Sequence, residues 1–400
     1  MRFVDPMRSY EMGQLQAGAA RIDITPHLGC DMAGYAGRTE GSRSIADPLY
    51  AKAIVLTDDQ QKIALVTTDL IGVKSDLVEQ VRSKVASETD LSADNIMISC
   101  SHTHFGPATY NSETNLTYID HLALKLETVI RLANQNLQPA RIGVGEGTID
   151  TISYNRHTIL PDGKAETNFR LPPKTADVTF GPCDPVIKVL RIDNLEQERI
   201  ATLINFACHP VTSTDQMHTI SADYPGYAMQ VVEQIEGGLC LFGLGCAGNI
   251  VPIQREGSYP KMIGRSLGGE VVKVAQWIQT VDQGELNVVH ETVTLPLKDT
   301  ESSEDIPIHC MSINQICFVG LPGEIFVEIG QAIRQRVKSD ETDKVNDLLL
   351  MSLTNGSVGY IPVCVAFEQG GYESGVSRFR PGCGEKLTEQ VVSLIERLNS

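Results

Sequence analysis

The sequence predicts an α/β fold, built as a single large domain with central mixed β-sheets flanked by helices. Strand-like and helix-like segments interleave along the whole chain, which is typical of this fold class. Several strand-like segments follow one another without an intervening helix, so a purely parallel sheet is not expected. The 400 residues, 42% of them hydrophobic, include no internal repeat and no low-complexity linker. A chain of this composition can build a sizeable core.

The elements of the N-terminal half follow from apolar periodicity, which alternates in strands and recurs every three or four residues in helices. Residues 1–15 are expected to be an N-terminal extension, and the domain is expected over residues 16–400. Strands are predicted over 21–25, 50–56, 62–68 and 95–100, a strand pair over 141–153, and helices over 77–87 and 118–133. Residues 154–184 are rich in proline, glycine and charge, and they predict a long loop that can serve as a lid.

The same periodicities define the C-terminal half. Strands are predicted over 186–192, 200–207, 240–244, 288–297, 315–319 and 348–353, and helices over 224–235, 259–278, 324–338 and 387–398. The strand over 288–297 is expected at a sheet edge. Acidic runs over 299–305 and 339–347 are expected to be solvated loops.

Charge and composition exclude several function classes. The formal net charge is −17, from 50 acidic and 33 basic residues. Such a chain is repelled by nucleic-acid phosphates and by anionic membranes, so neither nucleic-acid binding nor stable membrane insertion is expected. No apolar stretch has the length of a spanning helix. The ten cysteines form no CxxC pair, and no secretory leader is evident. Reduced thiols and a cytoplasmic location are therefore expected, whereas the oligomeric state stays open.

Two histidine motifs each follow a predicted strand. The segment 101–107 reads SHTHFGP, and alternate residues of an extended chain face the same way, so His102 and His104 converge. The segment 205–210 reads NFACHP and places His209 in the same situation. Taken alone, each motif also fits a hydrogen-bonded structural histidine.

A carboxylate and a phenol follow two further strands. Glu324 ends the segment GLPGE, where the simplest interpretation is a first-turn residue that complements a helix dipole. Tyr360 belongs to NGSVGYIP, which also fits a glycine-rich turn with a packed ring. Sites in α/β folds gather where strands end, so the four motifs are expected to meet.

Two imidazoles and one carboxylate are a ligand set typical of catalytic zinc, with one position left open for water. The sequence has no HExxH, no HxHxDH and no four-cysteine cluster, and it lacks the carboxylate-rich clusters that magnesium or calcium would need. Zn²⁺ is therefore the expected cofactor.

The motifs together resemble the catalytic N-terminal domain of the neutral/alkaline non-lysosomal ceramidase family. The matching segments, in chain order, cover residues 18–26, 32–35, 101–107, 154–156, 209–210, 221–227, 245–252, 323–324 and 360–373. The resemblance implies a zinc hydrolase domain with His102, His209, Glu324 and Tyr360 as metal ligands. It also implies that His104, Arg156 and Tyr372 line the active site, and Asn249 is expected to contact the substrate.

Two departures from the family pattern change the expected substrate. The family's active-site serine motif reads GNIVP here, so Val251 stands in the serine position and can be neither nucleophile nor donor. The C-terminal immunoglobulin-like domain of the membrane-active relatives is also not expected here, because residue 400 follows directly on the last predicted helix. The expected substrate is therefore a small, soluble amide, linear or cyclic, rather than ceramide.

The expected reaction is hydrolysis of an amide C–N bond by a zinc-activated water. His104 is the candidate general base or oxyanion donor, Tyr372 the preferred oxyanion donor, and Arg156 a bidentate clamp for a polar group of the substrate. Two anionic ligands would make a zinc-held water less acidic, so a long or partly neutral contact is expected for Tyr360. A zinc esterase or lactonase, or a non-catalytic protein on the same scaffold, are the alternatives.

Overall fold

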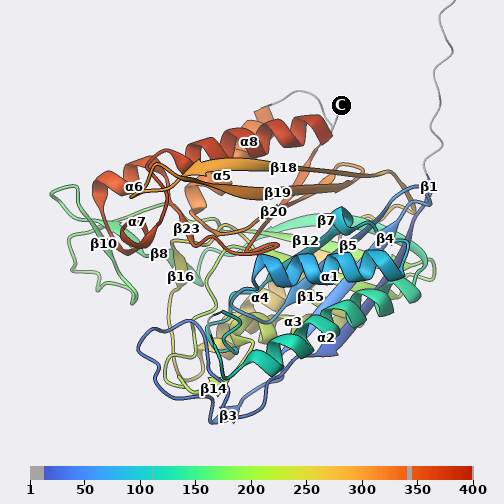
Figure 1. Ribbon diagram of the computed structural model, residues 1–400, viewed down its shortest axis with the longest axis horizontal. Helices are drawn as coiled ribbons and strands as arrows, with labels where there is room; N and C mark the ends of the chain where they lie inside the picture. Colours follow the sequence, from blue (N-terminus) through green and yellow to red (C-terminus); the bar gives the residue numbers. More distant parts are fainter. Residues whose placement is uncertain (1–12, 111, 340–344, 399–400) are drawn as a thin grey trace, which may run out of the picture.

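The computed structural model describes residues 13–110, 112–339 and 345–398, which form four layers in the order helices, sheet, sheet, helices (Figure 1). The larger sheet is mixed and eight-stranded. In order across the sheet, its strands are β15 (Leu239–Leu244), β13 (Arg199–Phe206), β12 (Val186–Asn194), β7 (Gln138–Thr148), β2 (Gln16–Asp23), β4 (Tyr50–Thr57), β5 (Lys62–Thr68) and β6 (Ile96–Cys100). The predicted α/β architecture with central mixed sheets is confirmed.

Four helices cover the outer face of this sheet. They are α1 (Ser75–Glu88), α2 (Leu116–Gln135), α3 (Asp223–Glu236) and α4 (Tyr259–Ala275). Their apolar stripes and the sheet enclose one core that includes Val78, Leu126 and Leu267. Because the other face of the sheet is also covered, strands such as β5 are buried almost continuously rather than on alternate residues.

The second sheet contains four strands and lies against the inner face of the first. Its order is β18 (Leu286–Pro296), β19 (Ser303–Ile313), β20 (Ile316–Leu321) and β22 (Asp347–Ser352), which leaves β18 at the predicted edge. A second core, with Leu65, Leu190 and Phe318 among its members, fills the space between the sheets. Helices α5 (Val327–Ser339) and α8 (Cys383–Leu398) cover the outer face of this sheet.

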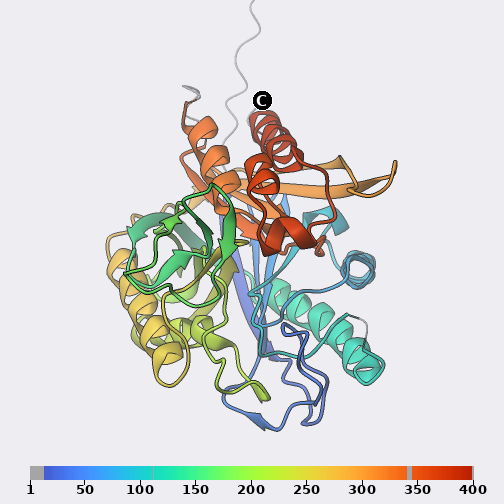
Figure 2. The same cartoon turned by 90° about the vertical axis from the view of Figure 1, so that its left-hand side faces the viewer.

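The region over 154–184 is not a structureless loop. Strand β8 (Ser153–Asn155) pairs with β16 (Ile250–Pro252), and β9 (His157–Ile159) lies between β10 (Ala165–Thr167) and β11 (Thr179–Phe180). Figure 2 looks onto this end of the molecule, where these green strands face the red segment with α6 (Cys364–Gln369) and α7 (Tyr372–Val376).

Some predicted boundaries differ from the observed ones. Of the extension expected over 1–15, residues 1–12 lie outside the described part, whereas β1 (Gly13–Gln14) pairs with β17 (Gln283–Gly284) and Leu15 is buried. The acidic run 299–305 is a loop only up to residue 302, because β19 starts at Ser303 and its charged side chains remain at the surface. Of the run 339–347, residues 340–344 lie outside the described part.

Short elements complete the described chain. The remaining strands are β3 (Ser44–Ile45), which pairs with β14 (Thr219–Ile220), and β21 (Glu324–Ile325), which pairs with β23 (Tyr360–Ile361); a single 3₁₀ turn spans Ala93–Asn95. All ten cysteines are described, and none forms a disulfide.

Candidate active site

The four predicted motifs meet at one end of the two sheets. His102 and His104 follow β6, and His209 follows β13, so the histidines leave the eight-stranded sheet. Glu324 and Tyr360 follow β20 and β22 of the four-stranded sheet, and the parallel pairing of β21 with β23 sets them side by side. The site is therefore assembled from strand ends of both sheets.

Hydrogen bonds to the main chain fix the orientation of two imidazoles. His102 Nδ1 lies 2.7 Å from the carbonyl oxygen of Ile71, and His209 Nδ1 lies 2.6 Å from that of Ala247. A carbonyl oxygen can only accept, so each Nδ1 carries the proton and each Nε2 presents a lone pair. His102 also adopts the left-handed backbone conformation (φ 68°), which is uncommon outside glycine and occurs at functional sites.

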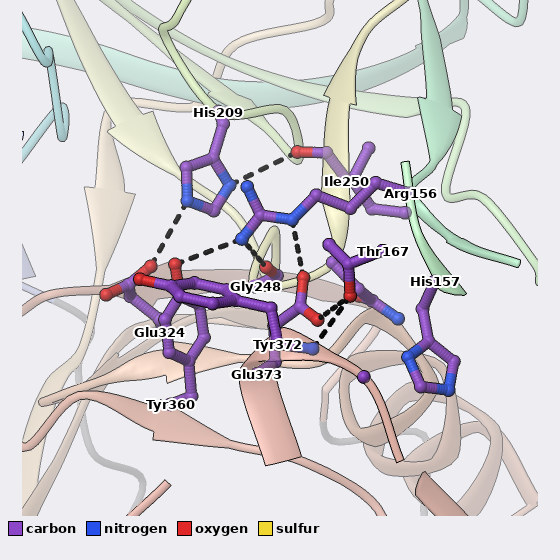
Figure 3. Close-up of polar contacts among 12 residues, drawn as sticks. Arg156, His157, Thr167, His209, Gly248, Ile250, Glu324, Tyr360, Tyr372 and Glu373 are labelled. Carbon is purple, nitrogen blue, oxygen red and sulfur yellow. Dashed lines mark hydrogen bonds and ion pairs between the residues drawn. The ribbon is translucent and has the colours of Figure 1, made fainter. Parts of the chain in front are cut away.

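Both lone pairs face the same carboxylate oxygen. Glu324 Oε2 lies 3.1 Å from His209 Nε2 and 3.3 Å from His102 Nε2 (Figure 3 shows the His209 contact). Burial lowers the pKa of His209 to about 4, so this ring is neutral at pH 7. Burial opposes charge on Glu324, but a positive charge next to it, such as that of protonated His102 or His209 in the metal-free protein, holds the pKa of Glu324 well below its usual range.

Three acceptor atoms that face one another repel unless a cation lies between them. The two Nε2 atoms and Glu324 Oε2 form such a group, because their protons are directed elsewhere or absent. Nitrogen and carboxylate donors at this spacing match the ligand preference of Zn²⁺. The residues present therefore fit a zinc ion.

His104 adds a third imidazole to the group. The ring nitrogens of His102, His104 and His209 lie within 4.8 Å of one another, and His104 Nε2 is 3.3 Å from His102 Nε2. His104 Nδ1 is buried and has no hydrogen-bond partner. Burial, reinforced by His102, lowers the pKa of His104 well below its usual range, so the ring is a neutral proton acceptor.

Glu324 and Tyr360 differ from their simplest interpretations. Glu324 is not in the first turn of a helix, since it lies in β21 and α5 begins only at Val327. Tyr360 Oη accepts a hydrogen bond of 3.0 Å from Arg156 Nη2. Burial and the negative charge of Glu324 raise the pKa of Tyr360 well above its usual value, so the phenol keeps its proton in the metal-free protein.

Arg156 is not a free clamp for substrate. Its guanidinium is buried, with Nε donating to Glu373 Oε1 over 2.5 Å and Nη2 donating to the carbonyl oxygen of Gly248 over 3.0 Å (Figure 3). Glu373 is fully buried, and its second oxygen accepts from Thr167 Oγ1. Arg156 therefore positions the Tyr360 hydroxyl, which corrects the expectation of a bidentate substrate contact. No role could be assigned to Glu373 from the sequence, although it directly follows the predicted site residue Tyr372.

The Tyr372 side chain lies next to Tyr360 and is accessible to solvent. Tyr372 begins α7, its side chain is about half-exposed, and its ring packs edge-on against Tyr360 and Phe169. Its hydroxyl has no hydrogen-bond partner in the described part of the chain, and Figure 3 shows the ring extending toward Glu324. This phenol can donate to an oxygen of a bound substrate.

Asn249 and Val251 serve the scaffold. Asn249 is completely buried, with Nδ2 donating to Glu328 and Oδ1 accepting from the Val327 amide, so its side chain is not free for the substrate contact that was expected. Val251 pairs with Tyr154 across β16 and β8 and packs against it. The serine position of the family thus carries only apolar atoms.

The chain is similar to several known proteins. Residues 15–239 match the family described as "Neutral/alkaline non-lysosomal ceramidase, N-terminal". The chain belongs to this ceramidase family. It is 27% identical over 246 residues to a neutral ceramidase of Mycobacterium tuberculosis, an alignment that covers 56% of this chain and 36% of the relative. A neutral ceramidase of Pseudomonas aeruginosa is 26% identical over 259 residues, covering 59% of this chain and 36% of the relative.

Solved ceramidase structures share the fold over nearly the whole chain. The crystal structure of the Pseudomonas aeruginosa neutral ceramidase matches with a TM-score of 0.80 at 20% identity, covering 97% of this chain and 75% of that one. The sequence alignments span only about a third of the curated ceramidases. Within the described residues, no helix combines the length and apolar character needed to cross a bilayer.

Proposed function

We propose that this protein is a zinc-dependent amidohydrolase that cleaves an amide C–N bond by metal-activated water. The observation that carries the proposal is that the Nε2 lone pairs of His209 and His102 face one Glu324 carboxylate oxygen at 3.1 and 3.3 Å, with both Nδ1 protons donated to main-chain carbonyls. Membership of the ceramidase family supports the amide as the bond that is cleaved.

The proposed metal ligands are His102, His209, Glu324 and Tyr360. A zinc ion in this position would supply Lewis-acid polarisation and an acidified water at neutral pH. The Nδ1 hydrogen bonds of His102 and His209 hold both rings in the tautomer that metal binding requires. Tyr360 is the weakest of the four donors, because it is a neutral phenol that already accepts from Arg156.

The remaining residues have roles in proton transfer and charge stabilisation. His104 is neutral, and its Nε2 lies 3.3 Å from His102 Nε2 on the side of the proposed metal ligands, so it can take a proton from the attacking water and pass it to the leaving amine. Tyr372 can donate a hydrogen bond to the oxygen of the tetrahedral intermediate. The Arg156–Glu373 pair orients Tyr360 toward the same space.

The proposed substrate is a small, soluble amide rather than ceramide. Val251 supports this difference, because a site without the family's serine hydroxyl loses one polar contact to its substrate. The ten unpaired thiols are consistent with the cytoplasm as the proposed location.

The proposal is tested by metal analysis followed by a substrate screen. We expect about one zinc per chain in the purified protein, and chelator-sensitive hydrolysis of amides with and without a ring. Chelator-sensitive turnover of esters or lactones alone would assign the site to the esterase class. A protein that neither contains nor takes up zinc would refute the proposal.

A further inference from the structure

Arg255 is a partly buried cation for which the described protein provides no partner. Its Nε and Nη2 atoms are shielded from solvent and make no hydrogen bond, and no carboxylate lies within ion-pair distance among the described residues. This is unusual in a chain with 50 acidic residues. Shielding donor atoms of a charged group from water without giving them hydrogen-bond partners is unfavourable, so such a group points to a ligand.

The position of Arg255 is fixed by its neighbours. Arg255 follows β16, in which Val251 pairs with Tyr154 of β8. The next residue, Glu256, makes three hydrogen bonds to other segments. The Glu256 amide donates to the carbonyl oxygen of Thr212, three residues beyond His209, and its carboxylate accepts from Thr214 and Arg170. Arg255 thus lies between the segment after His209 and the strands over 153–180.

The electrostatic neighbours of Arg255 include two residues next to the proposed active site, Tyr35 and Arg156. The Arg255 charge interacts most with Tyr35, Tyr154 and Arg156. Arg156 adds no free charge there, because Glu373 neutralises it at 2.5 Å. Arg255 therefore contributes about one uncompensated positive charge to this wall of the site.

Tyr35 provides a second unsatisfied donor in the same place. Its hydroxyl is buried without a hydrogen-bond partner, and its ring packs edge-on against His104 at 5.2 Å. Burial raises the pKa of Tyr35 to about 12, so the hydroxyl keeps its proton. Arg38 also lies over this ring, with its guanidinium carbon 5.1 Å from the ring centroid, and it donates only to main-chain carbonyls, so no described carboxylate pairs with its charge.

We propose that Arg255 and Tyr35 bind a carboxylate of the substrate, so that the amide cleaved here is an N-acylated amino acid or a similar carboxylated amide. A planar guanidinium can hold both oxygens of a carboxylate, and a neutral phenol adds one more donor. The positive charges of Arg255 and Arg38, which no described carboxylate pairs, favour an anionic group over a neutral one at this place. This inference rests on the proposed amidohydrolase function and specifies its substrate class.

The test separates binding from turnover. The probes are N-hexanoylglycine and its neutral counterpart N-hexanoylglycinamide, titrated into zinc-loaded and metal-free protein by calorimetry at constant ionic strength. We expect the carboxylate probe to bind at least tenfold more tightly than the amide probe, and Arg255→Gln to abolish that difference. Arg255→Lys should retain part of it. Arg265→Gln, which removes an exposed charge on α4, is the matched control and should change nothing.

Stability provides a second readout, because Arg255→Gln removes a charge that has no partner. The thermal midpoint of the ligand-free variant should equal or exceed that of the parent chain. Equal affinity for the two probes would refute the inference, as would a preference for the carboxylate that persists in Arg255→Gln but vanishes when zinc is removed. Arg255-dependent binding without any turnover would leave the inference standing and refute the proposed function. Turnover of neutral amides at a rate that Arg255→Gln does not change would support the proposed function and refute the inference.

Discussion

Arg156 Nε donates to Glu373 Oε1 over 2.5 Å, and both side chains are almost completely buried next to Tyr360. The pair links two elements that are far apart in the chain, because Arg156 lies between β8 and β9 and Glu373 lies in α7. It therefore joins the strands over 153–180 to the C-terminal segment of the site. Through Nη2, the same guanidinium orients the Tyr360 hydroxyl.

Removing the charge of Glu373 should destabilise the protein. Glu373→Gln leaves Arg156 buried without a counter-ion, and breaking a buried pair costs about 3–5 kcal/mol in the free energy of unfolding. Urea unfolding measures this loss. Glu368→Gln, an exposed carboxylate on α6, is the control and should change the free energy by less than about 0.5 kcal/mol. An equally small effect of Glu373→Gln would contradict the importance of the pair.

Replacing Tyr360 should lower turnover but not zinc content, whereas replacing His102 should lower both. Tyr360→Phe deletes the hydroxyl that accepts from Arg156 but leaves two imidazoles and one carboxylate for the metal. We expect turnover to fall by about 10²-fold while zinc stays near one per chain. His102→Ala should lose zinc and activity together. Stoichiometric zinc loss in Tyr360→Phe would show that the phenol is a full ligand.

The His104 imidazole occupies the space that a side chain at position 34 would fill, so residue 34 has to be glycine. Its φ is +102°, and a Cβ atom there would lie 2.6 Å from His104 Cγ. Gly34→Ala should displace the imidazole and lower turnover at least about tenfold, in line with loss of a general base, with zinc content unchanged. Gly29→Ala introduces a side chain at a similar φ of +87° in open space, so it controls for backbone strain. Equal activities of the two variants would argue against a catalytic His104.

Acid should weaken the fold through His309. This buried ring lies 3.2 Å from Arg82 Nη2 and 3.3 Å from Asn355 Nδ2, and burial together with the Arg82 charge lowers its pKa to about 3. The unfolded chain, with an ordinary histidine pKa near 6.5, binds the proton first. The stabilisation by neutral His309 is thus complete above about pH 6.5 and is lost as pH falls toward 3, by up to about 1.4 kcal/mol per pH unit.

The measurement is the free energy of urea unfolding at several pH values between 7 and 4. His309→Gln should make the dependence on pH shallower over this window. His121→Gln changes an exposed histidine on α2 and should leave the slope as it is. An unchanged slope in His309→Gln would assign the acid sensitivity to other groups.

Much of the fold could be predicted from sequence because apolar periodicity decides which elements form. The strand over 62–68 is observed within its predicted bounds, and the helices over 77–87 and 118–133 are each only a few residues longer than predicted. The pairing of two sheets face to face could not be predicted, because continuous apolar strands do not say which face meets which neighbour. Strand β19 (Ser303–Ile313) was not predicted at all, because its first residues, Ser303 to Asp305, are polar and belong to an acidic run that is typical of a loop.

Some residues of the candidate site could also be predicted from sequence, and others could not. Residues that end strands, such as His102 and His209, could be predicted from local motifs. The partner of Arg156 could not, because Glu373 is distant in the chain and a single carboxylate has no pattern of its own. The importance of Arg255 was also invisible, since it depends on which neighbours are missing.

Because the proposed ligands come from both sheets, the metal site forms only when the sheets pack together. His102 and His209 leave one sheet and Glu324 leaves the other, so their donor atoms converge only after the two sheets have docked. Such contacts between distant segments form late in folding. The time course of tight metal uptake during refolding would therefore report when the two sheets dock. The bound ion would also cross-link the two sheets and so stabilise their packing against each other.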